Sequence, residues 1–212
     1  IGSFLEIKTA ADLDAWFAEK DHPECDLGLF TDMARHSRLE QMGKGPGRYL
    51  SCGSYESPDG SAMYRAGCLD GSAHPLDPRK ITEDISHSWF EGDGAKHPSA
   101  GSTEPNVEKE GAYTWIKAPR YDGAVVEVGP CARLLVNRDP LATDLARVSG
   151  VNAYTRSLMR IFEMVLLVRN IEEWIGKIDP EEPVYLPHRD VKDAQGAGFV
   201  EAARGMLAHW IT

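Results

Sequence analysis

Arg204 lies in the segment EAARGMLAHW near the carboxyl end, where its immediate neighbours are small or apolar. A guanidinium in such surroundings needs hydrogen-bond acceptors, because an unpaired charge is costly to bury. Its five N–H donors form a fixed fork that suits an anionic or strongly polar ligand. Glu201, three residues earlier, would point away from Arg204 in a strand and lie on the same side in a helix. Arg204 is therefore a candidate for holding such a ligand.

Glu201, Glu127 and His209 are the candidate supporting residues, and the sequence leaves simpler structural explanations open for this group. An arginine such as Arg204 is most often exposed or held in a salt bridge. Glu127, in EVGP, could be a carboxylate near a helix start, where the dipole favours negative charge. His209 could be a hydrogen-bonded core histidine. Three nearby residues are expected to be structural, through turn geometry and ion pairs: Pro119, Arg120 and Arg133.

Other catalytic and metal-binding patterns are missing from the sequence. The glycine-rich GKGPG does not follow the phosphate-loop pattern, and neither GxSxG nor HExxH occurs. His87 and Ser88 are adjacent, so they would not face each other as a base and a nucleophile on a helix. The cysteines form no CxxC pair, so we expect no metal site within this chain. Reduced and mostly buried thiols are expected at Cys25, Cys52, Cys68 and Cys131.

Composition excludes two further classes of protein. The 212 residues are 42% hydrophobic and 26% charged, as in soluble globular proteins. A net charge of −10 with no basic cluster argues against a nucleic-acid surface. The sequence contains no run of 18 apolar residues, so no transmembrane helix is predicted. The amino-terminal residues do not resemble a targeting segment. Because the first residue is not methionine, we expect a piece of a longer protein or a processed product.

Hydrophobic periodicity and turn residues predict the elements that position these side chains. Thr9 starts a helix through a capping box with Asp12, and Asp122-Gly123 predicts a hairpin turn. Residues 91–112 form a long loop. The remaining expectations are helices at 24–42, 79–90, 129–137 and 151–178, strands at 48–55, 62–69, 113–121 and 124–128, and buried extended chain after 196.

The clearest element is the helix at 151–178, with apolar residues such as Val168 and Ile175 at mostly three- and four-residue steps and polar residues such as Glu163 opposite. Its length suggests packing in a bundle larger than this chain supplies. The predicted fold class is α+β, with mixed helices, antiparallel hairpins and this one long amphipathic bundle helix. Three regions are expected: a helical region at 1–47, a hairpin-rich region at 48–137 and a long helix plus extended segment at 138–212.

Four segments, in this order, resemble the large subunit of nickel–iron hydrogenases. They occur across residues 48–212 and resemble that family's patterns "NYLSYGxF", "IxExVxHSWY…HPxxGxTxP", "SWxKxPRYxGxxxEVGPLAR" and "GxGxxEAPRGxLxHWI". In this sequence they read RYLSCGSY, ITEDISHSWFEG…HPSAGSTEP, YTWIKAPRYDGAVVEVGPCARLLV and GAGFVEAARGMLAHWI.

The resemblance implies that the parent protein reversibly oxidises dihydrogen to protons and electrons, as an uptake hydrogenase would. It implies a nickel–iron centre with carbon monoxide and cyanide ligands, a magnesium site, and an iron–sulfur small subunit that receives the electrons. Arg204 would be the catalytic residue and overhang the metal pair, while Glu127 would order water near the magnesium. The location would be cytoplasmic, or periplasmic and peripheral to a membrane through the partner subunit.

The sequence also departs from the family pattern. Neither the RxCGxC-type nor the DPCxxCxxH-type motif occurs, although these supply the four metal-binding thiolates in the family. Ala203 stands where the family has proline before the arginine. We therefore expect a central segment of a large subunit that is inert on its own and forms a homodimer through surfaces left uncovered. The alternatives are a metal-free, quinone-reducing subunit of the same fold, or a docking module that contacts a partner through 91–112.

Overall fold

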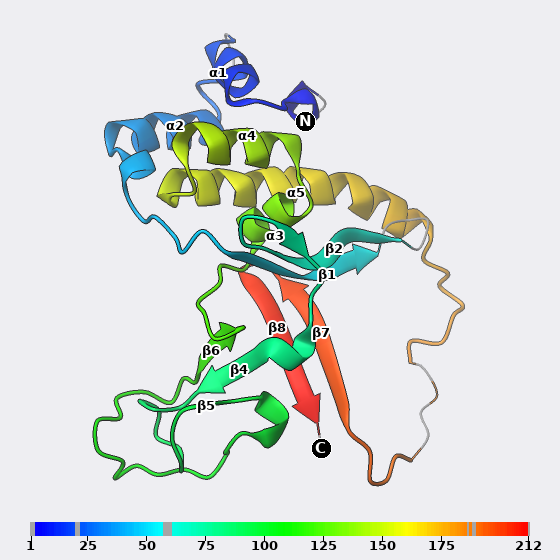
Figure 1. Cartoon of the computed structure of the whole chain (residues 1–212). Helices are drawn as coiled ribbons and strands as arrows, with labels where there is room; N and C mark the ends of the chain where they lie inside the picture. The colour runs from blue at the N-terminus through cyan, green and yellow to red at the C-terminus, as the bar shows by residue number, and fades with distance from the viewer. Residues whose placement is uncertain (1–2, 20–21, 57–60, 186, 188–189, 212) are drawn as a thin grey trace.

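The computed structural model describes residues 3–19, 22–56, 61–185, 187 and 190–211. Helices gather at one end of the molecule, and β-structure fills the middle and the other end (Figure 1). The amino terminus lies at the helical end, and the carboxyl terminus lies at the opposite end (Figure 1). This arrangement of helices and antiparallel hairpins confirms the α+β class predicted from the sequence.

The elements follow one another along the described residues in a mixed order. The helices are α1 (Ala10–Ala18), α2 (Asp26–His36), α3 (Pro130–Val136), α4 (Pro140–Ser149) and α5 (Ala153–Gly176), with short 3-10 helices η1 (Ser3–Glu6), η2 (Leu39–Gln41), η3 (Pro78–Lys80) and η4 (Pro98–Ala100). The strands are β1 (Tyr49–Glu56), β2 (Ala62–Leu69), β3 (Ala73–His74), β4 (Ile81–Asp84), β5 (Ala95–Lys96), β6 (Ala118–Tyr121), β7 (Gly196–Ala202) and β8 (Gly205–Ile211).

Several predicted helix starts are confirmed by their caps. The Thr9 hydroxyl accepts a hydrogen bond from the Asp12 amide, and the Asp12 carboxylate accepts one from the Thr9 amide. This reciprocal pair satisfies two amides that lack partners inside the helix. The Asn152 side chain caps α5 by accepting a hydrogen bond from the Thr155 amide. The α4 helix was not predicted, although Asp139 caps it and Pro140 begins it.

Helix α5 lies at the centre of the main core, although its buried face differs from the predicted one. Leu158, Met159 and Phe162 are buried against α3 and α4. Val168 and Ile175, expected in the apolar core stripe, are exposed. Glu163 was placed on the polar face and is buried instead. The buried residues of this core come from all three regions expected from the sequence.

An exposed apolar stripe therefore runs along the carboxyl-terminal part of α5 and just beyond it. Its members follow one another at alternating four- and three-residue steps, and each is more than two-fifths exposed: Met164, Val168, Ile171, Ile175 and Ile178. Residues at this spacing form a single seam on a helix. We call these five residues the α5 stripe.

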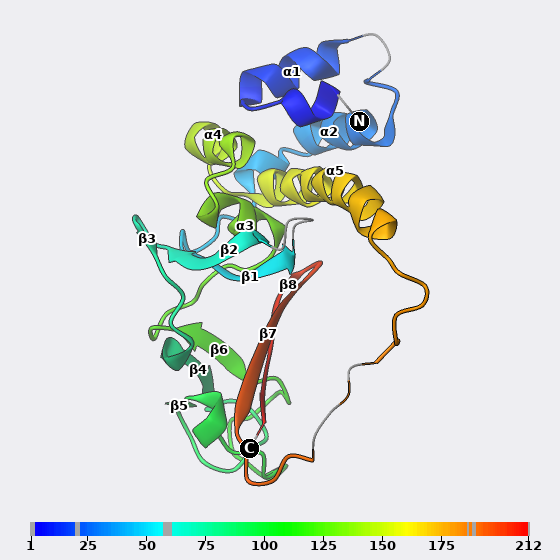
Figure 2. The same ribbon diagram turned by 90° about the vertical axis from the view of Figure 1, so that its right-hand side faces the viewer.

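The predicted hairpin of β1 and β2 is confirmed, with Tyr49 opposite Leu69 and Cys52 opposite Ala66. Its connecting residues 57–60 lie outside the described part of the chain. Strand β3 adds to the other edge of β2, which gives a three-stranded antiparallel sheet. This sheet lies beneath α3, α4 and α5 (Figures 1 and 2).

The prediction of a helix over residues 79–90 is wrong. Residues 78–80 form η3, and β4 follows, pairing with both β5 and β6. Ile81 and Ile85 are buried, and the Asp84 carboxylate accepts a hydrogen bond from the Ser86 amide, which turns the chain. Pairing with neighbouring strands and this local turn override the weak helical pattern.

The predicted hairpin around Asp122-Gly123 is correct at the turn but not beyond it. Tyr121 and Ala124 exchange two backbone hydrogen bonds, and both turn residues have positive φ. After the turn the chain leaves β6, and Glu127 bonds through its backbone to Arg48 and Leu50 instead. Residues 124–128 therefore join the β4–β6 sheet to β1.

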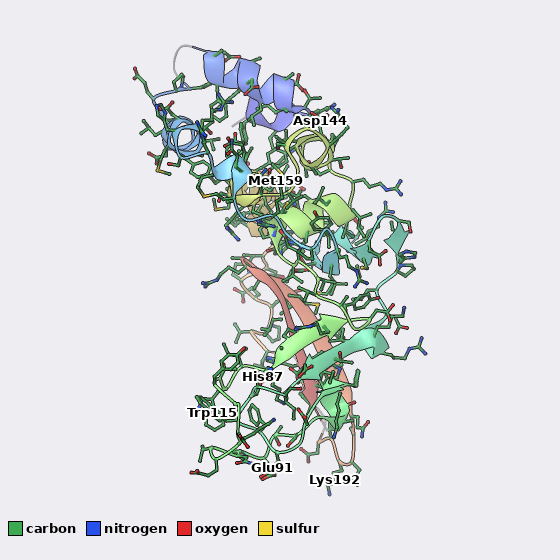
Figure 3. The ribbon with its side chains drawn as sticks, turned by 60° about the vertical axis from the view of Figure 1, so that its left-hand side comes forward. His87, Glu91, Trp115, Asp144, Met159 and Lys192 are labelled. Atoms are coloured by element: carbon green, nitrogen blue, oxygen red, sulfur yellow. The ribbon has the colours of Figure 1, made fainter. Side chains whose placement is uncertain are left out.

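The long connection over 91–112 is confirmed as mostly irregular, with only β5 and η4 in it. The Lys109 ammonium ties this end of the molecule together, because it donates to the carbonyl oxygens of Ile85, Phe90 and Gly92. Figure 3 shows His87, Glu91 and Trp115 here, far from Asp144 and Met159 in the helical part. Within the described residues, no helix is both long and apolar enough to cross a membrane.

Residues 196–211 form a two-stranded hairpin rather than one buried extended segment. Gly196 pairs with Ile211 and Ala202 with Gly205, so Ala203-Arg204 is the two-residue turn. Figures 1 and 2 show this hairpin spanning from the β1–β2 sheet to the lower end of the molecule. Much of it is exposed, including Val200 and Leu207, which contradicts the predicted burial. The two strands hydrogen-bond each other's backbone N–H and C=O groups, so the hairpin can form without being deeply buried.

Candidate functional site

The Arg204 side chain stands on the turn between β7 and β8 and is exposed. Glu201, three residues earlier on β7, is buried and only 4% exposed. Glu201 is thus enclosed by the protein, whereas Arg204 is open to solvent. Among the described residues, none forms a hydrogen bond or ion pair with the Arg204 guanidinium. Its five donors are free to face a ligand or another part of the protein.

Two glycines bring the Arg204 turn into direct contact with the segment before α3. A Cβ atom on Gly129, where φ is 104°, would lie 2.7 Å from the Arg204 carbonyl oxygen. A Cβ atom on Gly205 would lie 2.4 Å from Cγ2 of Val128. Both distances are too short for a side chain. The glycines thus permit a backbone approach that fixes the turn against the EVGP segment.

Arg133 lies one helical turn beyond Gly129 and is completely buried. Its Nε and Nη2 atoms donate to the two carboxylate oxygens of Glu163 on α5, at 2.7 and 2.5 Å. Its Nη1 atom donates to Oε2 of Glu201 at 2.6 Å and to the Ala202 carbonyl oxygen at 3.0 Å. Oε1 of Glu201 accepts a hydrogen bond from the Cys52 amide at 2.9 Å. We call Arg133, Glu163 and Glu201 the buried ion triad.

Electrostatics holds the Arg133 guanidinium in its charged form. Burial alone would lower the pKa of Arg133, but hydrogen bonds and charges from Glu163 and Glu201 outweigh it and raise that pKa. The guanidinium also lies 5.9 Å from the centre of the Tyr55 ring. Arg133 was expected to form structural ion pairs, and this expectation is confirmed. The role of Glu163 was missed, because the helical pattern placed it on the polar face.

Glu127 forms a second ion pair, with Arg156 of α5. Its carboxylate oxygens accept Nε at 2.6 Å and Nη2 at 2.9 Å, and Arg156 also donates to the Gly43 carbonyl oxygen. The hydrogen bonds to Glu127 raise the pKa of Arg156. Glu127 precedes Pro130, the first residue of α3, by three positions, so it lies outside that helix. Pairing with Arg156 therefore describes its environment better than a helix-start role.

His209 is exposed on β8, opposite Gly198, and is not the buried core histidine considered from the sequence. It lies beside a shallow hollow with Phe199 and Leu207. It lies five positions after Arg204 along an extended strand, so the structure does not bring the two side chains to one site. His87 and Ser88 also do not pair, because the Ser88 hydroxyl donates to the Ile116 carbonyl oxygen.

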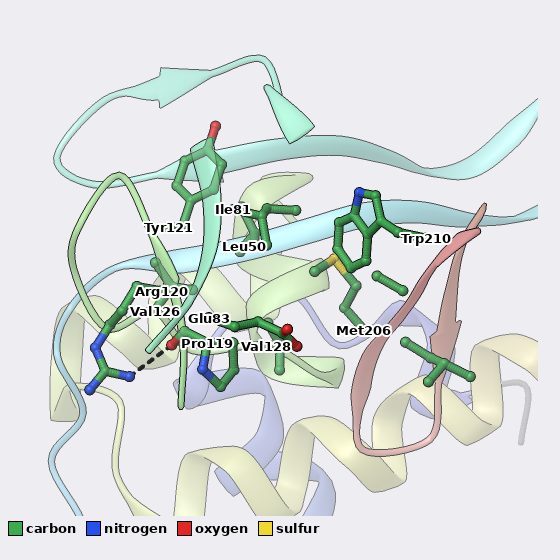
Figure 4. A pocket seen from close by; sticks show the side chains of 12 residues that line it. Leu50, Ile81, Glu83, Pro119, Arg120, Tyr121, Val126, Val128, Met206 and Trp210 are labelled. Atoms are coloured by element: carbon green, nitrogen blue, oxygen red, sulfur yellow. Dashed lines mark hydrogen bonds between the residues drawn. The ribbon is translucent and has the colours of Figure 1, made fainter. Parts of the chain in front are cut away.

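A cavity of about 250 Å³ lies between β8 and the β1 and β4–β6 strands (Figure 4). Met206 and Trp210 of β8 face Leu50 and Ile81 across it, and Glu83 and Arg120 are the charged residues in its lining. Arg120 points away and donates to the Pro119 carbonyl oxygen (Figure 4). The structural role expected for Pro119 and Arg120 fits this contact. The cavity wall is otherwise mostly apolar, so it offers little polar chemistry.

The described residues contain no cluster of three or more histidine, cysteine or acidic side chains that could hold a metal ion. The four cysteines are free: Cys68 and Cys131 are buried, Cys52 is half-buried and Cys25 is exposed. Burial raises the pKa of Cys52 and of Cys131 to about 12, which favours the neutral thiol. Soft metals bind thiolates, so this environment does not suit them.

A family model described as nickel-dependent hydrogenase matches residues 25–212. Among curated proteins, the periplasmic [NiFeSe] hydrogenase large subunit of Desulfomicrobium baculatum is 32% identical over 162 residues, which cover 68% of this chain and 32% of that protein. The hydrogenase-2 large chain of Escherichia coli is 28% identical, with 80% of this chain and 37% of that protein covered. The chain spans about a third of the length of these curated relatives.

Solved structures show the same similarity. The Ni-Fe-Se hydrogenase of D. vulgaris Hildenborough in the reduced state matches with a TM-score of 0.76 and 29% identity. That match covers 97% of this chain and 48% of the solved chain. The [NiFeSe] hydrogenase of Dm. baculatum matches with a TM-score of 0.71 and 28% identity, over 96% of this chain and 47% of the other.

Proposed function

We propose a function from one premise that the comparisons establish: the chain belongs to the nickel-dependent hydrogenase family. It is a partial region of the large subunit, and we infer that the whole protein catalyses H₂ ⇌ 2 H⁺ + 2 e⁻. The observation that supports this most directly is the family match across residues 25–212. The exposed Arg204, held on a turn against the EVGP segment, is the chemical feature that fits such a reaction.

Arg204 would act as a fixed cation in this reaction. Its directed N–H donors would hold small polar ligands and stabilise negative charge that develops as hydrogen is split. A guanidinium group has five N–H donors and no acceptor, so Arg204 would not serve as the base. Glu201 would support this residue from the opposite side of β7, through its bonds to Arg133 and Cys52.

Glu127 and His209 are less well placed than Arg204 to take part in the reaction. Glu127 is occupied by Arg156, so any ordering of water or magnesium would use the remaining lone pairs of its carboxylate. His209 is exposed and distant from the turn along β8. It could contribute only if other chain segments bring a site to that part of the strand.

The residues of this chain do not fit a nickel–iron centre by themselves. Cys52 and Cys131 hold neutral thiols, and the described residues contain no metal-binding cluster. The thiolates, and the carbon monoxide, cyanide and magnesium expected with them, would have to be held by chain outside these 212 residues. The chain alone would accordingly be inactive, and Arg204 would contribute only within the complete large subunit.

The complete protein would pass its electrons to an iron–sulfur small subunit, as the family relationship suggests. One curated relative is named a periplasmic hydrogenase large subunit. We propose that the location of this protein is set by its partner subunit. The chain alone would form a homodimer through the α5 stripe, because this seam exposes five large apolar side chains.

Hydrogen-dependent reduction of an artificial viologen dye by the natural full-length protein tests the proposal. Arg204→Lys keeps the charge but loses the planar fork, so we expect turnover to fall at least tenfold. Arg38→Lys, at an exposed residue beside η2, is the matched control and should retain full turnover. A full-length protein with bound nickel that does not consume hydrogen would overturn the proposal, whereas quinone reduction without metal would favour the alternative subunit type.

A further inference from the structure

We propose that Arg133 and Glu163 are positioning residues for Arg204, acting through the backbone of the β7–β8 turn. This inference deepens the proposed function and rests on it where it concerns catalysis. Neither side chain reaches the exposed face of the hairpin, because both are buried beneath it. Their effect on Arg204 would pass through Glu201 and Ala202, the two residues of β7 that come just before the turn.

One short segment contacts the turn on two sides. Gly129, at the N-cap of α3, meets the Arg204 carbonyl oxygen, and Val128 meets Gly205. Arg133, one helical turn further, holds Glu201 and the Ala202 carbonyl oxygen from below. Residues 128–133 therefore contact residues 201–205 on both sides of the turn. These contacts set the position of Arg204, since its own guanidinium contacts no partner among the described residues.

Glu163 gives the Arg133 guanidinium a single orientation. The two-point bond to Glu163 joins α3 to α5, the longest helix, and uses Nε and one Nη2 donor. Both Nη1 donors are then directed at β7, one to the Glu201 carboxylate and one to the Ala202 carbonyl oxygen. A planar fork fixed at one edge can aim its other edge in only one direction. The orientation of β7 therefore depends on a carboxylate 38 positions earlier in the chain, on α5.

A purely stabilising role would not require charges at this place. Well-packed apolar residues of similar volume often stabilise a core as much as a buried ion pair does. What the triad adds is directed bonding: four of the five Arg133 donors end on named oxygen atoms of α5 and β7. Such a device fixes geometry to within a fraction of an ångström, which is what a residue that touches reacting atoms needs.

Hydrogen exchange followed by mass spectrometry on the natural full-length protein tests the positioning role. Glu163→Gln keeps the shape of the side chain but weakens its hold on Arg133. We expect amide exchange in residues 200–206 to become at least tenfold faster, with exchange in α4 unchanged within twofold. Asp139→Asn is the matched control, a carboxyl-to-amide change at the N-cap of α4 that leaves the Ala142 contact possible. It should leave exchange in residues 200–206 unchanged.

Equal acceleration in residues 200–206 and in α4 would mean that the triad only stabilises the whole domain, and would overturn the proposal. No acceleration would also overturn it. If Glu163→Gln does not fold, Arg133→Lys carries the same test, because lysine keeps the charge and loses the fork.

Turnover separates this inference from the proposed function. We expect Glu163→Gln to lower the kcat of hydrogen-dependent dye reduction about tenfold with KM little changed, while Asp139→Asn keeps the unsubstituted kcat. Faster exchange at the turn with unchanged kcat would overturn the catalytic part. If the unsubstituted protein consumes no hydrogen, the proposed function fails, and the exchange result still decides whether Arg133 and Glu163 position the turn.

Discussion

Arg156 and Glu127 form a two-point ion pair, with Nε 2.6 Å from Oε1 and Nη2 2.9 Å from Oε2. The pair joins α5 to the segment that leads from the β4–β6 sheet into α3. The Glu127 side chain is 12% exposed and the Arg156 side chain 26% exposed, so water only partly screens the charges. Sequence alone could assign Glu127 to a metal site, but in the structure Glu127 joins α5 to the segment before α3.

Replacing Glu127 by alanine should destabilise the protein by about 2–3 kcal/mol, because the half-buried Arg156 would lose both charge-assisted bonds. The midpoint of urea unfolding measures this loss. Arg147→Ala is the control, since the Arg147–Asp144 pair has a largely exposed arginine and should leave the midpoint unchanged. Equal midpoints for Glu127→Ala and the unsubstituted protein would contradict the structural role of this pair.

Gly129→Ala should destabilise the protein about 2 kcal/mol more than Gly123→Ala. Both glycines have positive φ, so both substitutions carry backbone strain. Only Gly129 would also place its Cβ atom 2.7 Å from a backbone oxygen, that of Arg204, whereas nothing lies within 4 Å of a Cβ atom at Gly123. Chemical denaturation of the two variants measures the difference. Similar losses would show that the turn does not press against Gly129.

Local sequence signals predicted the elements whose partners are near in the chain. The Thr9 cap, the β1–β2 hairpin and the body of α5 each follow from neighbouring residues, and each is confirmed. The helix predicted over 79–90 failed because β4 is fixed by β6, some 36 positions further along. No local sequence pattern indicates the pairing of β4 with β6, so the weak helical periodicity gave a wrong prediction.

The same limit applies to the site. The sequence left open whether Arg204 and Glu201 lie on the same side, but the structural use of Arg133 was predictable from it. Glu163 was not, because its burial depends on an arginine from another helix, 30 positions earlier. A charged residue in an amphipathic helix is expected at the solvent face. One signal was available: Glu163 directly follows Phe162, on the border of the buried face.

Thiol alkylation should distinguish the four cysteines by their surroundings. At pH 8, iodoacetamide should modify Cys25 first, because it is exposed, while buried Cys68 and Cys131 react only after unfolding. Cys52 is half-buried with a pKa of about 12, so its alkylation should be slow despite partial access. Peptide mass spectrometry identifies each adduct. Rapid modification of Cys131 in the native protein would contradict the burial of α3.

Stability should fall in alkaline solution partly because of Cys131. Burial raises the pKa of this thiol from 9.0 in the unfolded chain to about 12 in the native protein. Its contribution is therefore complete below pH 9 and is lost as the pH rises towards 12. At pH 10.5 the loss should be about 2 kcal/mol, since each pKa unit corresponds to about 1.36 kcal/mol. Urea unfolding at pH 8 and 10.5 should show a smaller alkaline loss for Cys131→Ser, which lacks the titrating thiol; identical losses would contradict this account.

The chain of residues 1–212 should form a concentration-dependent dimer through the α5 stripe. Ile171 and Ile175 are 44% and 63% exposed, and pairing two such seams removes their apolar surface from water. Light scattering coupled to size exclusion should show the dimer mass at high concentration, and Ile171→Lys with Ile175→Lys should restore the monomer. Val148→Lys, at an equally exposed apolar residue of α4 outside the stripe, should leave the dimer intact. A monomer mass at every concentration, or loss of the dimer in Val148→Lys as well, would assign the α5 stripe no pairing role.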